Sequence, residues 1–155
     1  MKFTALTLEE YLNQLSSDAM VPGGGSASAY VSTLGMALTQ MVGRIALKRK
    51  KKQGLSPEES RKEDEKRKTL EEIVAAVEKT KRDAFQIVNL DPKVYKEVME
   101  VWSDPSKRED ALENSFRLQA ELAFLAVMAA EWNQNMAGLV AGSIKNDLLV
   151  SASLL

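Results

Sequence analysis

Apolar residues recur along most of this chain with the spacing of an α-helix. In the first segment, four of them fall at positions i, i+3, i+4 and i+7, on one face of a helix: Leu8, Tyr11, Leu12 and Leu15. Thr7 and Glu10 form a capping box before this stripe, in which each side chain binds a free backbone N–H group of the other residue. No segment alternates steadily between apolar and polar positions, so the pattern predicts an all-α protein without a sheet.

A second helix is expected over residues 27–48, where small and apolar residues lie on nearly every side. Residues 26–43 carry no charge, a property shared with membrane-spanning helices. However, hydroxyl and amide side chains are scattered around all faces of this segment, and Arg44 ends it. A helix buried between other helices explains that mixture better, so we expect a central helix and no membrane association.

Later helix starts are marked by a capping residue followed by proline, whose missing N–H group costs nothing in the first helical turn. This signal occurs three times, at Ser56-Pro57, Asp91-Pro92 and Asp104-Pro105. It predicts a long helix from Pro57 to about Val88, a short one from Pro92 to Trp102 and a long one from Pro105 to about Met136. Two glycines then precede a last helix that begins near Lys145.

Long helices joined by short connections indicate an antiparallel bundle of long helices, formed by a single domain over residues 1–155. Residues 118–130 carry apolar side chains on more than one face, which is more than one bundle core needs. Such a surplus face is typical of a contact between subunits, so we expect a homodimer.

Composition then limits the chemistry. The 155 residues include 21 basic and 22 acidic side chains, and this balance argues against nucleic acid as the main partner. The chain contains no Cys and no His, which excludes disulfides, thiolate or imidazole metal centres and the Ser-His-Asp triad. We therefore expect no bound metal, and any proton transfer must use Asp, Glu, Lys or Tyr. The first residues lack the apolar core of a signal peptide, so a cytoplasmic location is expected.

The sequence Pro22-Gly23-Gly24-Gly25-Ser26 leads directly into the second helix. Glycines let a ligand approach the backbone closely, and a helix start offers free N–H groups and a dipole that favours an anion or a carbonyl group. The spacing differs from that of a phosphate-binding P-loop. A tight turn between two helices is the alternative interpretation of this motif.

Other polar features also have a structural interpretation beside a functional one. The basic run over residues 48–52 has three possible interpretations: a solvated helix end, a nucleic-acid patch or an anion site. The run contains no interleaved aromatic residues, which argues against nucleic acid. Asp91 is an obvious N-cap before Pro92, and Asp147 suits the dipole at a helix start. Tyr95 lies one helical turn after Asp91 and either stacks on a ligand or fills the core.

Four motifs, in order, make the chain resemble the formiminotetrahydrofolate cyclodeaminase/methenyltetrahydrofolate cyclohydrolase family across essentially its whole length. They are the Pro-Gly-Gly-Gly-Ser motif, the basic cluster Lys48-Arg49-Lys50, the segment Asp91-x-x-x-Tyr95-x-x-Val98-Met99, and Asn146-Asp147 followed by small residues. The family has Ser where this chain has Asn146, and its members usually continue through a further helix after the last motif. We therefore expect one cyclodeaminase/cyclohydrolase-like domain that lacks a C-terminal helix.

The resemblance implies an enzyme that acts on the one-carbon unit of a tetrahydrofolate derivative and needs no separate cofactor. Catalysis is expected from Asp147 or Asp91 as the acid/base. Lys48 or Lys50 is expected to orient that carboxylate or the substrate. The residues expected to bind the substrate are Gly23, Gly24, Gly25, Ser26, Tyr95 and Asn146.

Two reactions of the family fit these requirements. A cyclohydrolase adds water to 5,10-methenyltetrahydrofolate and forms 10-formyltetrahydrofolate, whereas a cyclodeaminase releases ammonia from 5-formiminotetrahydrofolate. We favour the cyclohydrolase because no formiminotransferase half accompanies this chain to supply the formimino substrate. A non-catalytic helical dimer that binds folate or another ligand is the remaining alternative.

Overall fold

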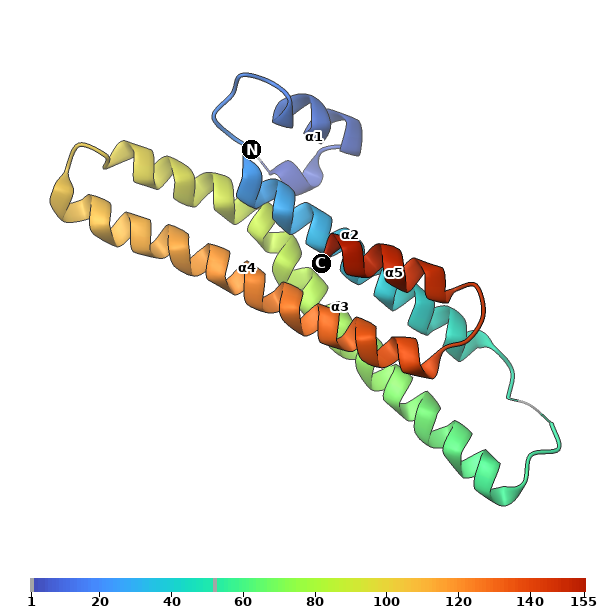
Figure 1. Ribbon diagram of the computed structural model, residues 1–155. Helices are drawn as coiled ribbons and strands as arrows, with labels where there is room; N and C mark the ends of the chain where they lie inside the picture. Colours follow the sequence, from blue (N-terminus) through green and yellow to red (C-terminus); the bar gives the residue numbers. More distant parts are fainter. Residues whose placement is uncertain (1, 52) are drawn as a thin grey trace. The chain divides into compact units, whose positions relative to one another are not determined.

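In the computed structural model, residues 2–51 and 53–155 are described (Figure 1). They form a short 3-10 helix, η1 (Phe3–Ala5), and five α-helices: α1 (Leu8–Leu15), α2 (Gly24–Lys48), α3 (Pro57–Glu100), α4 (Pro105–Leu139) and α5 (Lys145–Leu154). These residues contain no strand, which confirms the predicted all-α class.

Contacts between residues divide the chain into two compact units. Unit 1 comprises the residues up to Thr33 together with Arg82–Ala126, and unit 2 comprises Leu34–Lys81 together with Val127–Leu155. Helices α2, α3 and α4 each contribute one part to each unit. The single domain expected from the sequence stays a prediction.

Helices α2 and α3 run antiparallel within both units. Their side-chain and backbone contacts pair rising residue numbers on α2 with falling numbers on α3: Ser26 with Asp91 and Tyr30 with Phe85 in unit 1, and Gln40 with Glu78 and Leu47 with Arg67 in unit 2. The antiparallel arrangement predicted for the long helices is therefore confirmed for this pair.

The predicted caps form at three helix starts. At α1, Thr7 N donates to Glu10 Oε2 (2.7 Å) and Glu10 N donates to Thr7 Oγ1 (3.2 Å). Ser56 and Glu59 form the same pair of hydrogen bonds at the start of α3, at 2.8 and 3.3 Å. Asp104 caps α4 by accepting a hydrogen bond of 3.1 Å from the backbone N–H group two residues later. These helix starts follow from local sequence signals.

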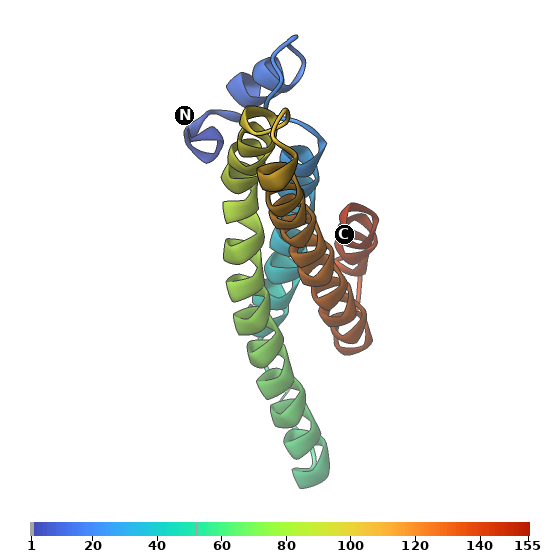
Figure 2. The same cartoon turned by 90° about the vertical axis from the view of Figure 1, so that its left-hand side faces the viewer.

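The prediction that one helix ends near Val88 and another begins at Pro92 is wrong. Helix α3, drawn green to olive in Figure 2, continues as one helix to Glu100, with Pro92 inside it. Proline lacks the N–H group that would bond to the carbonyl oxygen four residues earlier, which here belongs to Val88. That oxygen instead accepts a hydrogen bond of 2.8 Å from the hydroxyl group of Ser26 on α2. A residue distant in sequence thus replaces the missing bond.

Helix α2 is buried along one face only, because Val31, Leu34, Met41 and Ile45 on its other face are 37–47% exposed. The prediction of a helix buried between others on all sides is therefore confirmed only in part. Four of its polar residues are at most 6% exposed: Ser26, Ser32, Thr39 and Gln40. In unit 2, Asn133 of α4 donates to Thr39 Oγ1 (2.9 Å), and Ser151 of α5 donates to the carbonyl oxygen of Gly35 (2.7 Å). Internal hydrogen bonds therefore account for Ser26, Thr39 and Gln40 within the uncharged residues 26–43. None of the helices in the described part of the chain has an apolar stretch long enough for a membrane span.

Helix α4 carries apolar residues on two faces, as its pattern indicates. Leu122 is 6% exposed and packs into unit 1, whereas Phe116 and Phe124 are 73% and 64% exposed. An exposed apolar face of this kind is what a subunit contact requires. The homodimer itself stays a prediction.

Candidate functional site

In unit 1 the glycine motif and Asp91 come together. The sequence predicted that this helix begins at residue 27, but α2 begins at Gly24. Two of the three glycines therefore belong to its first turn. The carboxylate of Asp91 accepts hydrogen bonds from Ser26 N (2.9 Å) and from Gln119 Nε2 (2.7 Å), one at each oxygen. The prediction that Asp91 is the N-cap of its own helix is wrong, because Asp91 lies inside α3 and caps the start of α2.

The first turn of α2 still has unpaired backbone donors. The N–H groups of Gly24 and Gly25 make no hydrogen bond to any residue within 2–51 or 53–155, whereas those of Ser26 and Ala27 are bonded. N–H donors at the start of a helix attract negative charge, because the positive end of the helix dipole lies at the same place. A carboxylate and free N–H groups thus lie together at this helix end, where one can transfer a proton and the others can bind an oxygen atom.

The structure explains the three glycines of the motif in different ways. A Cβ atom at Gly25 would lie 2.1 Å from Asp91 Oδ1, so only glycine fits where α2 approaches this carboxylate. A Cβ atom at Gly23 or Gly24 would meet nothing within 4 Å. None of the three has a positive φ, so a left-handed turn does not explain them. Gly23 and Gly24 leave open space in which a ligand can reach the backbone.

Ser26 joins three elements of unit 1. Its hydroxyl group donates to Val88 O of α3 (2.8 Å) and lies 3.1 Å from the hydroxyl oxygen of Tyr11 of α1. Tyr11 is 3% exposed, and burial is the largest of the causes that raise the pKa of its hydroxyl group. Tyr11 therefore stays protonated at neutral pH. The N–H and hydroxyl groups of Ser26 are both bonded within the protein, so its observed role is to hold the site together.

Tyr95 lies one turn after Asp91 on the same continuous helix, as expected. Its side chain is 39% exposed. The ring is therefore not core filling, and it leaves a surface on which a flat ligand can stack.

The remaining predicted residues belong to unit 2. Lys48 is the last residue of α2 and Lys50 follows it, and both are exposed. Asp147 is half-buried in the first turn of α5, as predicted, beside the exposed Asn146. Among the residues that the structure describes, no hydrogen bond or ion pair joins Asp147 to either lysine. The structure thus brings together the predicted residues of unit 1 but forms no direct contact between these lysines and Asp147.

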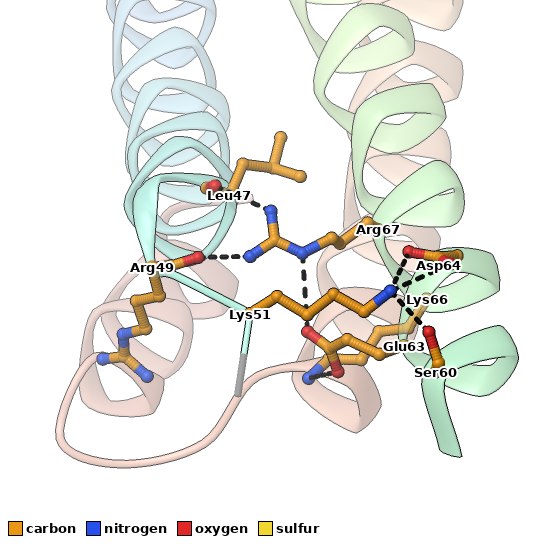
Figure 3. Close-up of polar contacts among 8 residues, drawn as sticks. All are labelled: Leu47, Arg49, Lys51, Ser60, Glu63, Asp64, Lys66 and Arg67. Carbon is orange, nitrogen blue, oxygen red and sulfur yellow. Dashed lines mark hydrogen bonds and ion pairs between the residues drawn. The ribbon is translucent and has the colours of Figure 1, made fainter. Parts of the chain in front are cut away.

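The basic run over residues 48–52 does not form one uniform patch. Arg49 donates to the carbonyl oxygen of Ala141 (2.9 Å), and Lys51 binds the carboxylate of Asp64 (2.8 Å; Figure 3). Lys52, the last residue of the run, lies outside the described residues. Arg49 and Lys51 are therefore bound to other residues of the protein, which the interpretation of the run as a solvated helix end did not predict.

The end of α2 is held by Arg67 of α3 (Figure 3). The guanidinium group of Arg67 donates to the carbonyl oxygen of Leu47 (3.1 Å) and to that of Arg49. Carbonyl groups at a helix end lack partners within the helix, so a basic side chain that binds them stabilises this end.

Unit 2 also contains a polar cluster that the sequence pattern did not reveal. Gln40 donates to Glu78 Oε2 and accepts a hydrogen bond of 2.6 Å from Lys81 Nζ. The bond from Gln40 is the largest cause that lowers the pKa of Glu78, and Lys81 adds to it. The sequence offered one signal, the i,i+3 spacing of Glu78 and Lys81 on one helix face. In the described part of the chain, no three acidic residues are grouped so as to hold a metal ion.

Comparisons with known proteins identify the family. A solved structure, formiminotetrahydrofolate cyclodeaminase from Thermotoga maritima, has a similar fold, with a TM-score of 0.83 and 22% sequence identity over 97% of this chain and 71% of that chain. No curated protein matches the sequence. The family model described as formiminotransferase-cyclodeaminase matches residues 7–155. Because this match spans most of the chain, the protein belongs to the formiminotransferase-cyclodeaminase family.

Proposed function

We propose that this protein is a folate one-carbon enzyme that hydrolyses 5,10-methenyltetrahydrofolate to 10-formyltetrahydrofolate. Its family membership supports a folate substrate. The observation that carries the proposal is the position of Asp91 at the start of α2, beside the unpaired N–H groups of Gly24 and Gly25. The reaction needs a carboxylate that moves a proton and donors that stabilise a developing oxygen charge, and this helix end supplies both.

In the proposed mechanism, a water molecule attacks the cationic methenyl carbon while Asp91 accepts one of its protons. The new C–O bond makes that carbon tetrahedral between N5 and N10. The hydroxyl proton then leaves to solvent as the C=O bond forms, and the N–H groups of Gly24 and Gly25 bind the oxygen. The bond from carbon to N5 breaks, and Asp91 returns its proton to N5. The formyl group remains on N10.

The surroundings of Asp91 suit this role. Ser26 N and Gln119 Nε2 each bind one oxygen of the carboxylate, which fixes its orientation before the substrate arrives. A carboxylate offers about four lone-pair sites, so the two that remain can bind the attacking water. The exposed ring of Tyr95, one turn further along α3, supplies a stacking surface for the flat pterin ring.

Asp147 is the alternative acid/base. Its carboxylate is half-buried and makes no hydrogen bond or ion pair with a described residue, so it is available for proton transfer. The exposed Lys48 and Lys50 are then the groups that orient the substrate, and Asn146 is a further contact to it. The exposed apolar face of α4 supports a homodimer, which we place in the cytoplasm.

The cyclodeaminase reaction is the second candidate. It is favoured by the family description and by the similar solved structure, which is a formiminotetrahydrofolate cyclodeaminase. In this reaction N10 attacks the formimino carbon, and Asp91 takes the proton of N10 and passes it to the formimino nitrogen. A second proton, from solvent, lets this nitrogen leave as ammonia while the lone pair of N5 forms the cationic methenyl group. The same residues serve both reactions, because both pass through a tetrahedral carbon.

Absorbance of 5,10-methenyltetrahydrofolate with and without protein tests the proposal, in a buffer that does not itself catalyse ring opening. Loss of the methenyl band faster than the spontaneous rate supports the cyclohydrolase. A parallel assay measures ammonia released from 5-formiminotetrahydrofolate. Ammonia release without methenyl hydrolysis contradicts the first reaction and supports the second. A folded protein that binds folate but performs neither reaction contradicts both and is the non-catalytic binder.

A further inference from the structure

A pocket of about 490 Å³ in unit 2 carries an excess of positive charge. Its walls come from the end of α2, the first half of α3 and the end of α4. Five basic side chains line it: Arg49, Lys50, Lys62, Lys66 and Arg67. The acidic side chains of the lining are Glu59 and Glu63.

Two carboxylates are too few to neutralise five basic side chains, whatever their partners. Glu63 is shared between Lys66 Nζ (3.5 Å) and Arg67 Nε (3.6 Å). Glu59 accepts a hydrogen bond of 2.8 Å from a backbone N–H group as part of the cap of α3. Lys50 has no hydrogen bond or ion pair with any residue of the described ranges. The pocket therefore retains positive charge that the protein does not compensate.

The two arginines of the pocket are oriented by backbone groups, and Arg67 shares Glu63 with Lys66 as well. Arg67 and Arg49 donate to backbone carbonyl oxygens, which are neutral partners. Lys62 pairs with Glu58 (2.7 Å), but both side chains are about 70% exposed, and such pairs are weak. Orienting the guanidinium groups in advance lowers the entropy that a ligand must overcome on binding.

We propose that this pocket binds a small molecule with several anionic oxygen atoms, supplied by carboxylate or phosphate groups. Guanidinium and ammonium groups bind both kinds of oxygen through charge-assisted hydrogen bonds. Leu70 and Val140 line the same pocket and are 2% and 5% exposed, and apolar walls strengthen the attraction between charges. Lys50 is shared with the Asp147 alternative of the proposed function, but the pocket as a whole is a separate anion site whose binding does not depend on the catalytic proposal. Its test measures binding and not turnover.

Isothermal titration calorimetry with citrate and, separately, with tripolyphosphate tests the proposal at low ionic strength. We expect at least one of the two to bind. Lys50→Gln removes a charge that has no partner in the described protein, so it should weaken that binding about tenfold without disturbing the fold. Lys62→Gln should weaken binding in the same direction. Lys96→Gln, an exposed lysine of α3 in unit 1, is the matched control and should bind as the wild type does.

The two probes distinguish the sources of the anionic oxygens. Binding of citrate alone supports a polycarboxylate ligand, and binding of tripolyphosphate alone supports a polyphosphate ligand. Binding of neither probe overturns the proposal. It is also overturned if Lys50→Gln and Lys62→Gln both bind as tightly as Lys96→Gln, because the anions then bind elsewhere.

Discussion

Replacing Ser26 by Ala tests why α3 continues through Pro92. In the protein the Ser26 hydroxyl group donates to Val88 O at 2.8 Å, the oxygen that Pro92 leaves without its helical partner. Because this proton goes to Val88, the hydroxyl group of Tyr11 must donate to Ser26 Oγ, at 3.1 Å. Ser26 is 0% exposed, so water does not readily replace the lost hydroxyl group. The substitution therefore leaves one buried acceptor and one buried donor unpaired.

A buried polar group without a partner costs about 1–3 kcal/mol. Ala is favoured over Ser within a helix by about 0.5 kcal/mol, which offsets a small part of this loss. With two such groups and this offset, Ser26→Ala should lower the free energy of unfolding by about 1.5–5.5 kcal/mol. In a chain of 155 residues, at about 3 °C per kcal/mol, that corresponds to a Tm lower by roughly 5–16 °C.

Urea unfolding followed by circular dichroism measures the loss. Ser28→Ala is the matched control, because Ser28 is exposed on the same helix and should change the free energy by less than about 0.5 kcal/mol. In a Pro92→Ala background, the restored N–H group can bind the Val88 oxygen, so Ser26→Ala should cost at least about 1 kcal/mol less. The reasoning would be refuted if Ser26→Ala and Ser28→Ala lowered the free energy of unfolding equally. It would also be refuted if Ser26→Ala cost the same in the wild type and in the Pro92→Ala background.

Two further predictions concern Gly25 and Glu78. Gly25→Ala should lower Tm and activity, because its Cβ atom would lie 2.1 Å from Asp91 Oδ1. Gly24→Ala meets nothing within 4 Å and should keep Tm within about 2 °C, so equal melting of the two variants would contradict the packing argument. The pKa of Glu78 is lowered in the folded state, so its ionised form stabilises the protein above its unfolded pKa, and that contribution disappears as pH falls through the lower folded pKa. Glu78→Gln should therefore lose less stability between neutral and acidic pH than the wild type and the exposed control Glu71→Gln, and parallel curves would exclude this role.

Helix starts could be predicted from the sequence where both capping partners lie within one turn. Thr7 and Ser56 each find their glutamate three residues later, so the local sequence contains the whole signal. The Asp-Pro pairs at residues 91–92 and 104–105 look alike, yet only the second begins a helix. The difference is tertiary, because Ser26 supplies the hydrogen bond that Pro92 cannot. Nothing in the sequence near Pro92 contains that information.

The candidate site was predictable only in part for the same reason. The glycine motif was selected by its own residues and Asp91 by the resemblance to the family, and the structure brings them together. Gln119, which holds the second oxygen of Asp91, has no distinguishing signal among the polar residues of α4. The cluster around Gln40 and Glu78 likewise depends on which faces of two helices meet. Packing between helices, and not the sequence of either one, decides which polar residues become partners.

The rate of 5,10-methenyltetrahydrofolate hydrolysis by Asp91→Asn, relative to Asp110→Asn, is the most direct test of the proposed catalytic carboxylate. The amide keeps the size of the side chain and one oxygen acceptor, and Asp110 is an exposed residue of α4 in the same unit, which controls for the loss of one charge. General acid–base catalysis contributes about 10²–10⁴-fold, so we predict at least a 100-fold loss of rate for Asp91→Asn, with folate binding and Tm close to those of the control. An Asp91→Asn protein that hydrolyses the methenyl substrate as fast as Asp110→Asn would contradict the role of Asp91.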